Sequence, residues 1–308
     1  MKNTIKLIII CFVVVFSCFA CRNRNNFLIK SGEVLATDII SEIEKGKNIY
    51  IEDAVIKGKL DFTSINSKNI IKPGVFVVYI PVSISFFNCT FDSEVIGFKS
   101  DNSGTVFVNF EKHFVCTNCI FKDKLCFNET IFMGLCDFSK SIFNSETEFT
   151  NTRFGGKNSY FNESSFNSDV YFNYAFFYFP VRFDMCFFKK NIFFQNSQFN
   201  SEANFNTCTF AGYTEFSNAT FRDFLNFNYS KFKSKTYIYN NNYFGLVDII
   251  DVEFSGKTEI IENNFYNLLR IKKLKNFDEL KFYENNFFII PEIDNKSIIE
   301  KNNINNIN

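Results

Sequence analysis

Phenylalanine recurs at a fixed spacing through the middle of this chain, and this spacing limits what the chain can fold into. Between Phe121 and Phe232 the steps from one ring position to the next alternate between six and five residues, so the pattern has a period of 11. One step of seven, from Phe154 to Phe161, contains Gly155-Gly156 and indicates an insertion of one residue. The rhythm continues at Ile238, Tyr243, Ile249, Phe254, Ile260, Phe265 and Ile271. Such a chain repeats one small structural unit many times.

The residue types in this stretch favour short extended segments over a helix. A helix with about 3.67 residues per turn would also show a period of 11. The stretch is rich in Phe, Asn, Ser, Thr and Tyr, which are mediocre helix formers, and poor in Ala and Leu. We call the regularly spaced ring and aliphatic positions described above ladder residues. Asn tolerates turn conformations, and it directly follows a ladder residue at Asn128, Asn144, Asn162, Asn167, Asn173, Asn200, Asn206 and Asn228. The pattern therefore predicts short strands joined by tight turns around one repeated interior, which also explains 46 Phe beside no Trp.

A second column of small residues supports this interpretation. Each five-residue step ends at a ladder residue, and the residue two positions before that end is always small. These small residues are Cys119, Thr130, Ser141, Thr152, Ser164, Ala175, Cys186, Ser197, Cys208, Ala219 and Ser230. Side chains two positions apart lie on the same face of an extended segment. The matching positions of the six-residue steps are slightly larger: Leu125, Cys136, Thr147, Val170, Val181, Ile192, Ala203, Thr214 and Leu225. Each face thus sends one large and one small group into a narrow interior.

These units resemble those of the pentapeptide-repeat superfamily, which centre on Leu or Phe with a small residue two places earlier. Residues 205–210 (FNTCTF) and 216–221 (FSNATF) show the pattern well, and residues 51–56 and 60–62 show it weakly. The resemblance implies an all-β fold, a right-handed quadrilateral β-helix with one unit on each face. Four faces of alternating five and six residues make a coil of 22, so every second small residue stacks. Cys119, Ser141, Ser164, Cys186, Cys208 and Ser230 are expected in one column, and Asn241 and Asn263 in another.

The ends of such a solenoid need caps, because open coils expose strand edges. Residues 33–48 are expected to form a short N-terminal capping helix, with Val34, Leu35, Ile39, Ile40 and Ile43 on one side and Gly46 as a stop. The β-helix is expected over residues 49–271, most regularly over 116–271, with a protruding loop at Ser100–Gly104. A C-terminal cap over 272–293 and a disordered, Asn- and Lys-rich tail over 294–308 complete the expected organisation.

The first twenty residues are typical of a secretory signal. Lys2 and Lys6 precede an apolar run that is shorter than the ~20 residues a spanning helix needs. Ala20-Cys21 resembles the lipobox of bacterial lipoproteins, which implies acylation of Cys21, and a weaker frame would place the lipid on Cys18 instead. Residues 21–32 are then expected to be a tether. The segment predicts a lipid anchor in the membrane of the bacterial cell envelope, periplasmic or surface-exposed.

The overall charge argues against a nucleic-acid partner. The chain has 33 basic and 33 acidic residues. Removing residues 1–20 deletes two lysines and no acid, so 31 basic residues stand against 33 acidic ones, a net charge of −2. The signs are mixed along the chain, without the basic face of a nucleic-acid binder or the acidic stripe of a DNA mimic.

Motifs with catalytic or metal-binding chemistry are weak. His113-x-x-Cys116-x-x-Cys119 has a metal-like spacing, but it lacks a fourth ligand, and both thiols fall at inward positions of the repeat. The seven cysteines other than the first three are expected to be buried free thiols, although stacked Cys186 and Cys208 leave a disulfide open. The chain contains one His, so few residue pairs could form the nucleophile and the His of a catalytic site. We expect no catalytic residue, no cofactor and no bound metal.

These observations favour a non-catalytic, lipid-anchored solenoid that serves as a binding or structural module at the envelope. The membrane is one expected partner, and a protein or a glycan is the other, while the sequence leaves the oligomeric state open. Two alternatives remain. A carbohydrate-active β-helix hydrolase would require paired carboxylates in a cleft. A DNA-mimicking protector of gyrase, as in some pentapeptide-repeat proteins, would require a cytoplasmic location and an acidic stripe.

Overall fold

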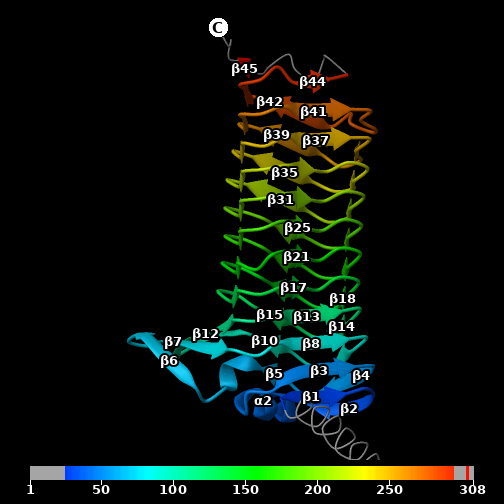
Figure 1. Cartoon of the computed structure of the whole chain (residues 1–308). Helices are drawn as coiled ribbons and strands as arrows, with labels where there is room; N and C mark the ends of the chain where they lie inside the picture. Colours follow the sequence, from blue (N-terminus) through cyan, green and yellow to red (C-terminus); the bar gives the residue numbers. More distant parts are fainter. Residues whose placement is uncertain (1–24, 295–302, 305–308) are drawn as a thin grey trace, which may run out of the picture.

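The computed structural model describes residues 25–294 and 303–304, which form an upright β-solenoid of stacked coils (Figure 1). The chain passes through sheets A, B, C and D in turn, and then begins the next coil. Within each sheet, strands of successive coils pair in parallel, apart from two hairpins described below. The expected four-sided, coiled all-β architecture is confirmed.

Sheets A and B form two adjacent sides of the solenoid. Sheet A contains β1 (Asn26–Ile29), β3 (Asn48–Glu52), β8 (Ile84–Phe87), β13 (Phe114–Thr117), β17 (Cys136–Asp137), β21 (Ser159–Tyr160), β25 (Val181–Arg182), β29 (Ala203–Asn204), β33 (Leu225–Asn226), β37 (Val247–Ile250), β41 (Leu269–Lys272) and β44 (Glu292–Ile293). Sheet B contains β2 (Gly32–Leu35), β4 (Ala54–Lys57), β9 (Thr90–Phe91), β14 (Ile120–Phe121), β18 (Ile142–Phe143), β22 (Ser165–Phe166), β26 (Phe187–Phe188), β30 (Thr209–Phe210), β34 (Lys231–Phe232) and β38 (Glu253–Phe254).

Sheets C and D form the other two sides. Sheet C contains β5 (Leu60–Asp61), β10 (Val95–Ile96), β15 (Leu125–Cys126), β19 (Thr147–Glu148), β23 (Val170–Tyr171), β27 (Ile192–Phe193), β31 (Thr214–Ser217), β35 (Thr236–Tyr239), β39 (Thr258–Ile261) and β42 (Leu280–Tyr283). Sheet D contains β6 (Lys68–Lys72), β7 (Val75–Ile80), β11 (Phe98–Asp101), β12 (Gly104–Phe110), β16 (Ile131–Phe132), β20 (Arg153–Phe154), β24 (Phe176–Phe177), β28 (Gln198–Phe199), β32 (Thr220–Phe221), β36 (Asn242–Tyr243), β40 (Asn264–Phe265), β43 (Asn286–Phe287) and β45 (Asn303–Ile304).

The strand register reproduces the period of the sequence. Through most of the solenoid a residue pairs with the residue 22 positions later, as Phe121 does with Phe143. Across the Gly155-Gly156 insertion the offset becomes 23, as between Phe143 and Phe166. The one-residue insertion is therefore absorbed at a corner, and the faces on either side stay in register.

Two hairpins interrupt the register near the N-terminal end. Ile49 pairs with Ile84, 35 residues later, and Ile84 pairs with Phe114, 30 residues later, so these coils are 13 (35 − 22) and 8 (30 − 22) residues longer than the others. The additional residues build the antiparallel hairpins β6–β7 and β11–β12, which project from one side in Figure 1. The loop expected at Ser100–Gly104 is the turn of β11–β12, whereas β6–β7 was not anticipated because no ladder residue marks it.

The interior consists of columns of stacked rings. Neighbouring rings of one column lie nearly parallel, with centroids 4.5 Å apart for Phe143 and Phe166. Rings on different faces meet edge to face, as Phe183 and Phe194 do at 5.6 Å and 83°. Both arrangements suit the electrostatics of aromatic rings. The 21 ladder rings from Phe121 to Phe232 are all buried, at most 3% exposed, so the ladder positions are confirmed as the core.

The small inward residues form hydrogen bonds with backbone groups of neighbouring coils. Ser141 Oγ accepts a hydrogen bond from the Cys119 amide at 3.0 Å and donates one to the Cys116 carbonyl at 2.7 Å. In the other column, fully buried Asn241, Asn263 and Asn285 form a ladder in which each Oδ1 accepts the backbone N–H of the residue 22 positions earlier. Both expected columns are confirmed, and their polar atoms are paired as buried groups require.

One residue in every 11 adopts a left-handed conformation at the corners that precede sheets B and D. Asn118, Glu129, Lys140, Asn151 and Glu163 have φ between 55° and 60°. The conformation disfavours most L-residues, although Asn tolerates it. Several of the Asn residues that directly follow a ladder Phe lie one position before a left-handed residue, and three of them have another role. Asn128, Asn173 and Asn228 each accept a backbone N–H of the next coil through Oδ1. The expected turn residues are therefore wrong: the left-handed residue directly follows Asn128, Asn173 and Asn228, and none lies next to Asn144, Asn167 or Asn200.

The N-terminal end corrects two expected boundaries. Helix α2 covers only Ala36–Glu44, not 33–48, because Gly32–Leu35 pairs with β4 as strand β2. Ile39 and Ile43 are buried against the first coils as expected, whereas Leu35 is exposed. Gly46, with φ of 74°, follows the helix end as predicted. The tether expected over 21–32 is also too long, since β1 already pairs with β3 from Asn26 onward.

The C-terminal end of the solenoid also differs from the expected boundaries, because the strands extend further than expected. Residues 272–293, expected as a separate cap, continue the coils: β42, β43 and β44 pair with β39, β40 and β41. Phe282 and Phe287 occupy inward ladder positions 22 residues after Ile260 and Phe265, so the repeat extends beyond residue 271, where it was expected to end. Within the tail expected to be disordered, Asn303–Ile304 pairs with β43, and residues 295–302 and 305–308 lie outside the described structure.

Candidate functional site

The outer face of sheet C carries a row of side chains aligned along the solenoid axis. Because neighbouring residues of a strand point to opposite faces, the second residue of each strand faces outward while the first is buried. Through successive coils these outward residues are Cys126, Glu148, Tyr171, Phe193, Glu215, Tyr237 and Glu259. The row combines aromatic rings with carboxylates, and it divides into an acidic cluster and a groove lined by tyrosines.

The aromatic part of the row changes its packing along the axis. Tyr171 and Phe193 stack almost in parallel, at 5.1 Å and 8°. Tyr213, which precedes β31, lies 5.7 Å from Phe193 at 49° and 6.0 Å from Tyr237 at 54°. The rings therefore splay apart between the coils of β27 and β35 instead of covering one another.

A groove of about 510 Å³ opens where the rings splay. Its lining comes from β31, β35 and the corner between sheets C and D: Gln195, Asn196, Tyr213, Glu215, Ser217, Asn218, Tyr237 and Tyr239. The volume lies within the range of ligand sites, about 300 to 1,000 Å³. Phenol rings, amides and a hydroxyl on a regular sheet thus form a rigid, mixed apolar and polar surface.

Hydrogen bonds hold the tyrosines of the groove in place. Glu215 accepts one bond from the Tyr213 hydroxyl at 2.9 Å and another from Ser217 Oγ at 2.7 Å, so both of its carboxylate oxygens are engaged. Burial raises the pKa of Tyr213, and the adjacent Glu215 carboxylate raises it further. The phenol therefore remains a hydrogen-bond donor. At the edge of the groove, the Tyr239 hydroxyl donates to Glu262 at 2.7 Å.

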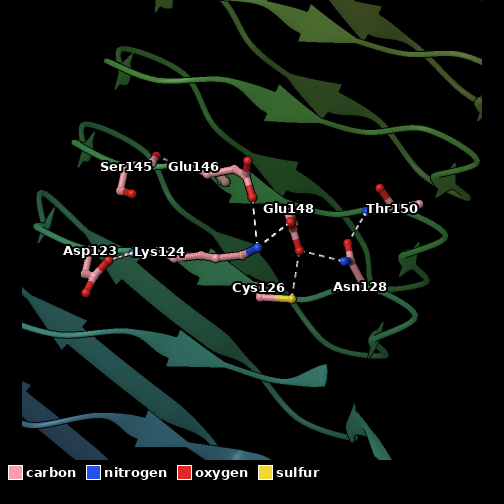
Figure 2. Close-up of polar contacts among 9 residues, drawn as sticks. Asp123, Lys124, Cys126, Asn128, Ser145, Glu146, Glu148 and Thr150 are labelled. Carbon is pink, nitrogen blue, oxygen red and sulfur yellow. Dashed lines mark hydrogen bonds and ion pairs between the residues drawn. The ribbon is translucent and has the colours of Figure 1, made fainter. Parts of the chain in front are cut away.

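The acidic cluster lies on the same face nearer the N-terminus (Figure 2). Lys124 Nζ bridges Glu146, at 2.8 Å, and Glu148, while Cys126 Sγ donates to Glu148 Oε2 at 3.1 Å. Asn128 Nδ2 donates to the same oxygen at 2.7 Å. Burial alone would raise the pKa of Glu148, but its contact with Glu146 and the Lys124 ammonium outweigh burial and lower it. Glu148 is thus held as a carboxylate.

The metal-like motif does not assemble a site. Cys116 and Cys119 are fully buried at their expected inward positions, whereas His113 Nδ1 accepts the Leu135 backbone N–H at 3.0 Å. Within residues 25–294, His, Cys, Asp and Glu side chains form no group of three or more that could hold a metal. The thiols of the motif pack as small inward groups, and the His belongs to the backbone network of a corner.

The seven described cysteines are all buried free thiols, as expected. Cys186 and Cys208 stack on neighbouring coils, and each Sγ donates to a carbonyl 25 residues earlier, Phe161 and Phe183, at 2.9 Å. Their thiols point at backbone oxygens instead of at each other. Cys126, nearest to the surface, lies beside Glu148, and burial raises its pKa to about 12.

These thiols are expected to be inert in the folded protein. At pH 8, a pKa of about 12 leaves a thiolate fraction roughly a thousandfold below that of a free cysteine. A chain that starts at Arg22 keeps the seven thiols, and Ellman's reagent should modify none of them within an hour in buffer and all seven in guanidinium. Ser103→Cys, in the exposed β11–β12 turn, is the positive control and should react at once. Rapid modification of any native thiol would contradict the buried packing.

The residues expected to carry the anchor, Cys21 and its alternative Cys18, lie outside the described structure. Among the described helices, none is both long and apolar enough to cross a membrane. The aromatic residues between positions 171 and 179 lie on different parts of the coil: Tyr171 stacks on Phe193 outside sheet C, whereas Phe176 of sheet D packs against Tyr178 at 4.2 Å.

Sequence reasoning missed the groove itself. Phe193, Glu215, Tyr237 and Glu259 lie 22 residues apart, so they become neighbours only when the chain is written in coils of 22. The signal was present, because the inward ladder positions define this register. The outward residues vary in type from coil to coil, so no repeated residue marks them in the sequence.

Comparison with known proteins agrees with the repeat. Residues 127–175 match the family model described as pentapeptide repeats, with nine copies. No curated protein and no solved structure matches the chain. The matched residues span β16 to β23 and the whole corner before β24, and the same coil continues on both sides of them. The match and the fold together identify the middle of this chain, residues 127–175, as a stretch of pentapeptide repeats.

Proposed function

We propose that this protein is a non-catalytic binding module, lipid-anchored through Cys21 at the bacterial envelope, whose solenoid presents the groove on sheet C to a partner outside the membrane. The observation that carries the proposal is the position of the groove relative to the N-terminus. β1 and β29 are the first and eighth strands of sheet A. With coils roughly 4.8 Å apart, seven steps place the coil of β29 and β31 about 34 Å from the base.

The N-terminal sequence supports a short attachment to the membrane. Only residues 22–25 separate Cys21 from β1, which begins at Asn26. Four residues span at most about 14 Å when fully extended. An acylated Cys21 would therefore hold the base of the solenoid near the lipid surface, and the rigid stack of coils would carry the groove well clear of the headgroups.

Two glutamates of the outward row on sheet C, Glu148 and Glu259, support a binding role over hydrolysis. A glycoside hydrolase needs one carboxylic acid that is protonated near neutral pH, hence a raised pKa. The pKa of Glu148 is lowered, and Lys124 bridges it to Glu146. Burial also acts to raise the pKa of Glu259, but contacts with Lys257, Tyr237 and Lys281 outweigh it and lower that pKa as well. Neither carboxylate suits the role of proton donor.

The anchor is tested by the intact mass of the protein purified from its native host. The wild-type chain should begin at Cys21, be heavier by its acyl groups, and partition into the detergent phase. Cys21→Ala should lose the acyl mass and the detergent partitioning, whereas Cys18→Ala, the matched control, should keep both. An unmodified full-length wild-type chain would refute the anchor, and loss of the lipid only in Cys18→Ala would move it to that residue.

A further inference from the structure

The groove on sheet C offers ring surfaces and hydrogen-bonding groups side by side. Tyr213 and Tyr237 are inclined at 54° and only partly buried, and Tyr239 is 38% exposed. Farther along the row, the parallel stacking of Tyr171 on Phe193 leaves no such opening. The tyrosines of the groove are therefore walls that an apolar surface can contact.

Amide groups beside these rings are available to a ligand. Within the described part of the chain, no protein group hydrogen-bonds to the side-chain amides of Gln195 and Asn196, although their backbone groups are paired. Each amide offers two donors and one acceptor oxygen. A ligand that has both hydroxyl groups and apolar C–H faces would use the amides and the rings together.

The charge of the groove argues against ionic ligands. Its one carboxylate, Glu215, already accepts bonds from Tyr213 and Ser217, and no Lys or Arg lines the groove. An anion would therefore meet the Glu215 carboxylate inside the groove, and the Lys235 ammonium at its edge already lies over the face of the Tyr237 ring. A cation would meet Lys235, whose ammonium lies 4.5 Å from the centre of the Tyr237 ring at the edge of the groove. The chemistry that remains is neutral and rich in hydroxyls.

We propose that this groove binds a neutral oligosaccharide, with sugar rings packed against Tyr213, Tyr237 and Tyr239 and sugar hydroxyls bonded to the amides of Gln195 and Asn196. The inference names the ligand class of the binding module proposed above and rests on that function. Because the lining spans the coils of β27, β31 and β35 along the axis, a linear chain aligned with the solenoid fits the groove better than a single sugar.

Calorimetric titration of the full chain tests the assignment. The probes are cellohexaose, hexa-N-acetylchitohexaose and hexagalacturonate, at up to about 5 mM, where a Kd near 1 mM is detectable. At least one of the two neutral hexasaccharides should bind, and hexagalacturonate should not. Binding of one neutral hexasaccharide and not the other distinguishes plain hexose from acetamido sugar, and either result supports the proposal.

Variants locate the binding. Tyr237→Ala and Tyr239→Ala should each weaken the neutral hexasaccharide by about tenfold, the loss of one ring contact. Tyr237→Phe, which keeps the ring, should stay close to wild type. Tyr266→Ala, an exposed tyrosine outside the groove that stacks on Phe244, is the matched control and should leave affinity unchanged. Equal urea midpoints of all variants show that each is folded.

The outcomes separate this proposal from the lipid anchor. Binding is measured on both the acylated protein in detergent and the Cys21→Ala chain, because the groove lies on the solenoid and does not need the lipid. Three results would each overturn the saccharide site. They are the absence of binding to both neutral probes, a preference for hexagalacturonate, and binding that Tyr237→Ala and Tyr239→Ala do not weaken. The acyl mass of the same samples reports on the anchor independently.

Discussion

Replacing Phe194 with alanine is expected to lower the free energy of unfolding by about 3–5 kcal/mol, as found for buried large-to-small changes. The ring is fully buried and stacks between Phe172 at 5.1 Å and Phe216 at 4.7 Å. It also meets Phe183 and Phe205 edge to face, at 5.6 and 5.5 Å. Backbone hydrogen bonds to the coils on both sides hold the cavity open, so the neighbours cannot collapse into it.

Urea unfolding followed by circular dichroism measures this loss. Phe194→Leu, which keeps most of the volume, should cost less than about 1.5 kcal/mol. Phe187→Ala, seven residues earlier but outward-facing and 38% exposed, is the matched control and should cost far less than Phe194→Ala. Because each coil contacts only its neighbours, an interior defect should also broaden the transition by uncoupling the two halves. A loss below about 1 kcal/mol for Phe194→Ala would contradict the close ring packing.

Asn263→Ala is expected to cost a similar amount, about 3–5 kcal/mol, through unsatisfied backbone groups instead of a cavity. Asn263 is fully buried, and its Oδ1 accepts the Asn241 backbone N–H at 3.0 Å. Its Nδ2 donates to the carbonyls of Ile238 and Ile261, both at 2.9 Å. Alanine would leave the buried Asn241 N–H without its acceptor and remove the amide donor from the Ile238 carbonyl, while the Ile261 carbonyl keeps its bond from the Asn240 N–H. Each group left unsatisfied costs about 1–3 kcal/mol.

The protein itself supplies the control for this prediction. Ser230, in the other column of small residues, accepts the Cys208 N–H 22 residues earlier at 3.0 Å and donates to the Phe205 carbonyl 25 residues earlier at 2.6 Å. Asn263 makes the corresponding bonds to Asn241 and Ile238. Asn263→Ser should therefore recover more than half of the stability that Asn263→Ala loses, in the same urea experiment. Equal losses for both variants would show that shape, not hydrogen bonding, sets the cost.

The period of the sequence predicted the coil because the interior of a solenoid is the same environment in every turn. Phe at the large positions and Cys, Ser, Thr, Ala or Asn at the small ones repeat wherever the chain returns to one face. The expected boundaries of the solenoid were wrong where one residue pattern fits more than one structure. Gly32–Leu35 has the apolar residues of a helix face but pairs with β4, and residues 272–293 continue the coil, with Phe282 and Phe287 pairing with Ile260 and Phe265. Strand pairing with an existing coil decided both cases.

The candidate site was less accessible to sequence reasoning. Tyr213 and Glu215 lie two residues apart in one repeat unit, Tyr237 lies 22 residues after Glu215, and no motif joins the three. They become a groove because coils of 22 residues place them side by side on the outside of sheet C. His113, Cys116 and Cys119 show the reverse: a motif visible in the sequence is separated by the strand alternation, which sends both thiols inward.

The sequence by itself determined the coil, its 22-residue register, the identity of the core columns and the insertion at Gly155-Gly156, because each depends on residues close together along the chain. Tertiary structure alone decided where the solenoid begins and ends, that β6–β7 projects from it, and which outward side chains meet. The physical reason is that inward and outward side chains are constrained by different contacts. Inward side chains must fill a fixed volume and are therefore constrained locally, whereas the outer surface is defined only by what neighbouring coils stack above and below.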